Sequence, residues 1–160
     1  MEFIVQLDYE WATFIKVVIS AILAGLVGIE REMVDKPAGF RTHMIVGGAV
    51  ALLVSLSEVI VQHFADLPFA RHIQSDPIRI IQAVIIGISF IGAGTVLQLK
   101  KEFKVKYLTT AATILFASGI GICVALNQFY LAAGVTLLTL FINFVIGYLR
   151  DLLIPKNKKS

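Results

Sequence analysis

Five apolar runs, separated by short polar segments, dominate the hydropathy pattern of the chain. Each approaches the roughly 20 residues that a helix needs to cross a bilayer. The pattern therefore predicts an all-α integral membrane protein, a bundle of five transmembrane helices. The runs cover about residues 11–29, 44–64, 78–99, 107–126 and 129–149.

The composition agrees with this interpretation and leaves little sequence for a second folded domain. Hydrophobic residues make up 58% of the chain and charged residues 16%, whereas soluble domains are about 45–50% apolar and about 25% charged. We expect one transmembrane domain over residues 1–150 and a basic cytoplasmic tail over residues 151–160. The acidic N-terminal segment is unlike a signal peptide, so we predict that the first span is retained. The single cysteine, Cys123, excludes an internal disulfide.

Basic residues gather in three segments that would lie on one side of such a bundle. Residues 30–43, 100–106 and 150–160 hold three, four and four of the 14 lysines and arginines. Cytoplasmic loops of membrane proteins are rich in these residues, so we predict that the N-terminus lies outside and the C-terminus in the cytoplasm. The formal charge of +3 then reflects topology in a lipid bilayer, and we expect no nucleic-acid partner.

Small residues cluster in the third run, where residues 87–97 read GISFIGAGTVL. Glycine costs up to about 1 kcal/mol in a helix interior relative to alanine. In lipid, small side chains let helix backbones approach closely, so we expect residues 78–99 to form the central helix of the bundle. The residues to which we assign helix packing are Gly25, Gly28, Gly87, Ser89, Gly92 and Gly94.

Two ionisable residues, Lys16 and Glu58, lie well inside predicted spans. At about 1.5 Å per residue, both lie roughly 20–22 Å above the cytoplasmic boundary. We predict that they sit at one level, where an ion pair could form between the first and second spans. The alternative is that each side chain reaches separately for the outer headgroups.

The polar segment after the first span, residues 30–43, reads EREMVDKPAGFRTH. Its proline and glycine predict a turn at the cytoplasmic mouth of the first two spans. We expect Glu30 to face the bundle while its neighbours face water; a solvated turn is the alternative. Magnesium prefers carboxylates and keeps several waters, so Glu30 and Glu32 are weak candidate ligands for a possible Mg²⁺. No other cofactor is expected, since the three histidines lack zinc-ligand spacing.

Uncharged polar residues inside the fifth run form a shared face. Thr136, Thr139, Asn143 and Gly147 follow three- and four-residue spacing. A buried asparagine in lipid seeks a hydrogen-bond partner on another helix. That role is the commoner one for such residues, and an ion or polar ligand site is the alternative.

Four sequence blocks resemble the MgtC/SapB family of bacterial inner-membrane proteins, in the order in which that family carries them. They are GLVGIERE (Gly25–Glu32), KPAGFRTHMIV (Lys36–Val46), DPIRIIQAVIIGISFIGAGTVL (Asp76–Leu97) and LTTAATI (Leu108–Ile114). The resemblance implies a multi-pass protein of the bacterial cytoplasmic membrane linked to magnesium and, in some pathogens, to virulence. Many members add a soluble C-terminal domain, so the resemblance concerns the membrane domain only.

The resemblance also implies a set of functional positions. Its polar members are Glu30, Arg31, Glu32, Arg41, Thr42, His43, Asp76, Arg79 and Gln82, and its small and hydroxyl members are Gly87, Gly92, Gly94, Thr109 and Thr110.

Two functional hypotheses follow from these patterns. In the first, the protein serves magnesium homeostasis or adaptation to low magnesium by modulating a partner membrane protein through helix contacts. In the second, it transports Mg²⁺ or another cation along a polar path lined by Glu30, Arg41, Thr109, Thr110 and Asn143. The small-residue faces of the first, third and fifth runs predict a homodimer. Because hydrolase and phosphate-loop motifs are absent from the sequence, we expect no enzyme.

Overall fold

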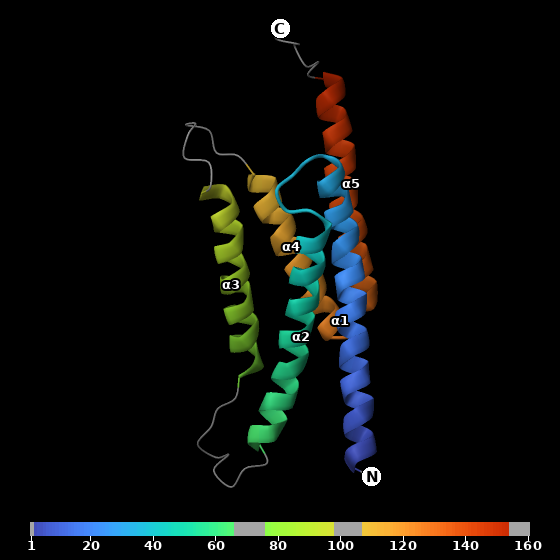
Figure 1. Ribbon diagram of the computed structural model, residues 1–160, viewed down its shortest axis with the longest axis vertical. Coiled ribbons are helices and arrows are strands. Elements are labelled where there is room, and N and C mark those ends of the chain that lie inside the picture. Colours follow the sequence, from blue (N-terminus) through green and yellow to red (C-terminus); the bar gives the residue numbers. More distant parts are fainter. Residues whose placement is uncertain (1, 66–75, 98–106, 154–160) are drawn as a thin grey trace.

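The structure, a computed structural model, describes residues 2–65, 76–97 and 107–153, and every regular element in these ranges is an α-helix. Successive helices run in opposite directions, so α1 begins and α5 ends at opposite ends of the bundle (Figure 1). The helices are α1 (Glu2–Met33), α2 (Phe40–Ala65), α3 (Pro77–Leu97), α4 (Leu108–Ala125) and α5 (Phe129–Leu153).

Four of these helices are long and apolar enough to cross a membrane. The apolar part of α5 is shorter and covers Phe129–Val145. The prediction of an all-α membrane protein with five helices is therefore confirmed, and the chain is a multi-pass membrane protein. The predicted domain boundary at residue 150 falls within α5, which ends at Leu153.

The α1–α2 turn, the end of α3, the start of α4 and the end of α5 all lie at one end of the bundle (Figure 1). This arrangement brings together the helix ends that flank the basic sequence segments. The segments 98–106 and 154–160 themselves lie outside the described residues. The orientation of the bundle in the membrane, with this end in the cytoplasm, stays a prediction.

The centre of the bundle is α4, and the prediction that α3 is central was wrong. α4 packs against each of the other four helices, whereas α3 packs against α4 and α2 and lies at one edge (Figure 1). Half of the α4 span is buried inside the bundle, against 6% of the α3 span. A side-chain carbon added at Gly87 or Gly94 would meet nothing within 4 Å, and Ser89 is exposed. Gly92 alone of the four lies buried, against Ala111 of α4.

The tightest contacts join α1, α2 and α4 at a set of small residues that we call the glycine interface: Ser20, Ala24, Gly47 and Gly121. A Cβ atom added at Gly47 would lie 2.6 Å from the Ala24 Cβ. One added at Gly121 would lie 2.7 Å from the Gly47 carbonyl oxygen. The Ser20 hydroxyl donates a hydrogen bond of 2.8 Å to that same oxygen. The three backbones therefore touch, and any larger residue would separate them.

The predicted ion pair between Lys16 and Glu58 does not form. Lys16 Nζ instead donates a hydrogen bond of 3.1 Å to the carbonyl oxygen of Ala125, the last residue of α4. Carbonyl groups at a helix C-terminus have no intrahelical partner and carry partial negative charge, so they attract the ammonium group. Among the described residues Glu58 takes part in no ion pair, and its side chain is exposed.

Candidate functional site at the α1–α2 turn

The turn between α1 and α2 is held by hydrogen bonds across its two helix ends. The backbone of Asp35, in the left-handed region at φ 52°, donates to the Glu32 carbonyl at 3.1 Å. Lys36 donates its backbone N–H to the Arg31 carbonyl at 3.0 Å. The carboxylate of Glu32 then accepts the backbone N–H of Phe40 at 2.9 Å, which caps the start of α2. Glu32 thus links the end of one helix to the start of the next.

Arg31 and Glu30 form a two-pronged ion pair beside this turn. Arg31 Nε donates a hydrogen bond to one oxygen of the Glu30 carboxylate and Nη2 donates to the other, both at 2.6 Å. The side chain of Arg31 is 6% exposed and that of Glu30 15%. Such bidentate pairs are among the strongest polar contacts in proteins.

The expectation that the neighbours of Glu30 face water was wrong for Arg31. Arg31 follows the buried residues Ser20, Ala24 and Val27 at intervals of four, three and four residues. This spacing places Arg31 on the stripe of α1 that faces the bundle. Its long side chain can still turn toward Glu30 and satisfy its charge there.

His43 is fully buried in α2, one helical turn before Gly47 of the glycine interface. Its Nδ1 is 2.9 Å from the carbonyl oxygen of Gly39. A carbonyl can only accept, so Nδ1 carries the proton. The other ring nitrogen, Nε2, is buried and has no hydrogen-bond partner among the described residues. A Cβ at Gly28 would lie 3.0 Å from the His43 Cβ, and Arg31 and Glu30 are close enough to act on the ring electrostatically.

Thr110, at the start of α4, lies on the same side of the interface. It is buried, and its hydroxyl has no partner among the described residues. It shares the buried face of α4 with Ile114 and Gly121. Ile114 packs in one cluster with Ala38 of the α1–α2 turn, and Thr110, one turn nearer the start of α4, lies at the same end of the bundle as that turn (Figure 1). The interface of α1, α2 and α4 therefore has Arg31, His43 and Thr110 at the end that lies nearest the α1–α2 turn.

Asn143 belongs to α5, and its side-chain amide nitrogen is buried. Its amide nitrogen has no hydrogen-bond partner among the residues described, so the predicted bond to another helix is not present there. Thr136 and Thr139 are buried on the same face, as predicted. Their hydroxyls donate to carbonyl groups of α5 itself, at 2.9 and 2.8 Å.

The remaining predicted site residues do not join this cluster. Arg41 and Thr109 are exposed, and Thr42 is partly buried. Asp76, Arg79 and Gln82 are exposed at the start of α3, at the opposite end of the bundle (Figure 1). There the Asp76 carboxylate accepts the Ile78 backbone N–H at 2.9 Å, and Arg79 lies 3.9 Å from it. These contacts give Asp76 the role of a helix cap.

The two predicted magnesium ligands are both engaged by the protein itself. Arg31 holds both oxygens of Glu30, and the Phe40 backbone binds one oxygen of Glu32. Within the described ranges, no three His, Cys, Asp or Glu residues are grouped as a metal site. Sequence reasoning missed Ser20 and Ser55, two buried serines. The four-residue step from Ser20 to Ala24 was the available signal for the first.

Comparison with known proteins adds the family context. The sequence profile of the MgtC family matches residues 17–152. The chain is 35% identical over 143 residues to the putative magnesium transporter YhiD of Escherichia coli K12, covering 89% of this chain and 64% of that protein.

Two further relatives are Protein SapB of Bacillus subtilis and Protein MgtC of Salmonella typhimurium. SapB is 33% identical over 81% of this chain and 53% of its own length. MgtC is 32% identical over 78% of this chain and 48% of its own length. The chain thus spans about half to two thirds of the curated relatives it matches. No solved structure matches it.

Proposed function

The chain belongs to the MgtC family, and from that premise we propose that it serves magnesium homeostasis by modulating a partner membrane protein. The link to magnesium is supported by its relatives, one of which is named a putative magnesium transporter. In this proposal the protein acts in the bacterial cytoplasmic membrane, is not an enzyme and does not conduct ions. The homodimer stays a prediction.

The observation that carries the non-conducting proposal is the glycine interface, which lies next to the polar cluster formed by Arg31, His43 and Thr110. An ion entering beside Arg31 and His43 would meet Gly47 and Gly121 next. Added Cβ atoms at these two glycines would lie 2.6 Å and 2.7 Å from the facing helix. The backbones touch at this level, so the contact between these helices holds no channel wide enough for a hydrated ion. The packing of α1, α2 and α4 therefore supports a closed bundle.

The charges at the turn support the same proposal. A transport path for a dication needs carboxylates that are free to replace its waters. The Glu30 carboxylate is neutralised by Arg31 at 2.6 Å, and Glu32 caps α2. Glu32 thus fastens the end of α1 to the start of α2, and we assign to this turn the role of holding α1 and α2 in the arrangement that a partner recognises.

A cation transporter is the second candidate, and the name of the Escherichia coli relative favours it. Transport would require α4 to move away from α1 and α2, because the path is closed where their glycines meet. The two candidates therefore differ in a measurable property of the isolated protein.

The test is to reconstitute the purified protein into vesicles that contain a magnesium-sensitive dye. We expect dye signals equal to those of protein-free vesicles, with an ionophore added at the end to show that the dye responds. Growth of a deletion strain in low magnesium should be restored by the wild-type gene and lost with Arg31→Met. Saturable magnesium flux from the pure protein would overturn the proposal in favour of transport.

A further inference from the structure

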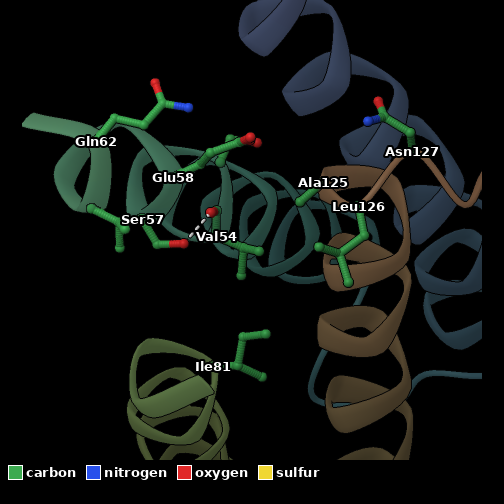
Figure 2. A pocket seen from close by; sticks show the side chains of 10 residues that line it. Val54, Ser57, Glu58, Gln62, Ile81, Ala125, Leu126 and Asn127 are labelled. Atoms are coloured by element: carbon green, nitrogen blue, oxygen red, sulfur yellow. Dashed lines mark hydrogen bonds between the residues drawn. The ribbon is translucent and has the colours of Figure 1, made fainter. Parts of the chain in front are cut away.

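A second polar site lies at the opposite end of the bundle, beside the ionisable residue Glu58. A cavity of about 440 Å³ opens there between α2, the start of α3 and the α4–α5 turn (Figure 2). Pockets for small molecules occupy about 300–1,000 Å³. The cavity is therefore large enough for the head group and upper chain of an amphiphile.

Ser55 is one of the residues that line this cavity, and its hydroxyl is buried beside it without a partner among the described residues. The residue is 4% exposed, and its Oγ makes no hydrogen bond to any described residue. Most buried hydroxyl groups in proteins do have a partner, so this one is an unsatisfied polar group next to the cavity. Ser57, which is equally buried, satisfies its own hydroxyl by donating to the Val54 carbonyl at 2.6 Å.

The charge at this end favours a cation. Glu58 is the one charged residue that lines the cavity, and it has no ion-pair partner in the described part of the chain. An ionisable group at membrane depth is a functional candidate by default. Lys16 lies near the same helix end but is bound to the Ala125 carbonyl. Asp8 and Glu10 are exposed acids at this end and add negative charge, and the exposed cation Arg79 lies 3.9 Å from Asp76.

The two sides of the cavity differ in polarity. Figure 2 shows the polar ends of Gln62, Glu58 and Asn127 on one side and the apolar side chains of Ile81 and Leu126 on the other. Amide and carboxylate oxygens accept hydrogen bonds from an ammonium group, which has three to donate. The aliphatic side chains on the facing side can pack against a hydrocarbon chain. A bare metal ion has no apolar part that could pack against them.

We propose that this cavity binds a membrane lipid whose head group carries a primary ammonium. The ammonium lies on the Glu58 carboxylate and donates to the amide oxygens beside it. The upper part of the acyl chain packs against Ile81, between α2 and α3. This inference concerns a lipid site at the end of the bundle opposite the α1–α2 turn. It is independent of whether the protein conducts magnesium.

The test compares lipid retention by purified full-length variants in nanodiscs. The discs contain either phosphatidylethanolamine or phosphatidylcholine at equal anionic lipid content, and native mass spectrometry counts the lipids that stay bound. We expect the wild-type protein to retain phosphatidylethanolamine several-fold better than phosphatidylcholine. Glu58→Gln should bring that ratio to about one, while Glu10→Gln, the same charge change at the same end, should leave it unchanged.

A second variant tests the cavity without changing its charge. Ile81→Trp should fill the apolar side and also abolish the preference, and thermal unfolding should show that both variants remain folded. Equal retention of the two lipids by the wild-type protein, or an undiminished preference in Glu58→Gln, would overturn the proposal. Binding of free ethanolamine to lipid-free protein in detergent, as tight as that of the lipid, would overturn the assignment to a lipid. None of these readouts depends on magnesium flux.

Discussion

The helices α3 and α4 are both apolar and rich in small residues, yet α4 lies at the centre of the bundle and α3 at its edge. The difference lies in what their glycines meet. Gly121 of α4 lies against the backbone of Gly47, whereas Gly87 and Gly94 of α3 meet nothing within 4 Å. Small residues permit close approach between helices in lipid, but an interface forms only where a facing helix fills the space, as Gly47 does opposite Gly121 and Phe40 does opposite Gly25.

Hydroxyl groups separate the two helices more clearly than glycines do. Thr110, Thr113 and Ser118 are all buried in α4. Thr113 and Ser118 donate to carbonyl groups of their own helix, at 2.9 and 2.6 Å, so their burial leaves no donor unpaired. Between α3 and α4, buried hydroxyls therefore distinguish the more central helix, whereas a glycine cluster permits contact without producing it.

The largest expected effect distinguishes the two helices directly. Gly121→Leu should destabilise the protein by at least about 3 kcal/mol, because the new side chain must push α2 and α4 apart. The matched change Gly87→Leu should alter stability by less than about 0.5 kcal/mol, since the space around it is open. Thermal unfolding in detergent, followed by size-exclusion chromatography, gives both values. Equal losses would remove the distinction between the helices.

The next largest effect concerns the ion pair between Arg31 and Glu30, beside the α1–α2 turn. Arg31→Met should cost about 2–3 kcal/mol, because it leaves the largely buried Glu30 carboxylate without its partner. The double variant Arg31→Met with Glu30→Gln should be more stable than Arg31→Met alone. The same unfolding assay measures both, and a double variant less stable than the single one would show that the pair is not the source of the effect.

A smaller effect should separate two glycines within α3 itself. A Cβ at Gly92 would lie 3.5 Å from the Ala111 Cβ of α4, whereas Gly94 has nothing within 4 Å. Gly92→Leu should therefore destabilise the docking of α3 by about 1–2 kcal/mol, and Gly94→Leu should not. Limited proteolysis of the two variants in membranes would report the docking, and the reverse order of susceptibility would contradict this placement.

The smallest expected effect concerns the far end of α4. Lys16→Met removes the ammonium from the Ala125 carbonyl and should cost about 0.5–1 kcal/mol. Arg79→Met is the control, because its side chain is 82% exposed and forms only a 3.9 Å ion pair, which contributes little. A larger loss in the control would show that overall charge, rather than this contact, sets the stability.

Much of the fold could be predicted from the sequence, because hydropathy determines which segments enter a bilayer. The five predicted runs match five helices, and the turn at Pro37 and Gly39 separates α1 from α2. The helices extend beyond the apolar runs at several ends, as α1 does by starting at Glu2. Backbone hydrogen bonds continue a helix into water when nothing breaks it, and hydropathy does not record this.

Helix order and side-chain partners could not be predicted in the same way. Apolar residues facing lipid and those facing the bundle have the same hydropathy, so the glycine cluster wrongly favoured α3 over α4 as the central helix. Lys16 was expected to seek a carboxylate, but the free carbonyl at the end of α4 satisfies it instead. The direction of Arg31 was encoded in its spacing from Ala24 and Val27, which only the packed structure identifies as the buried stripe.

The most direct test of this arrangement is disulfide cross-linking from α3 to α4 in native membranes. In a Cys123→Ala background, Ala111→Cys is combined in turn with Gly87→Cys, Gly92→Cys and Gly94→Cys. Disulfides need Cβ atoms about 3.5–4.5 Å apart, and among the three glycines Gly92 has that distance to Ala111. We predict rapid cross-linking for the Gly92 pair alone. Cross-linking at Gly87 or Gly94 that equals or exceeds it would contradict the peripheral position of α3.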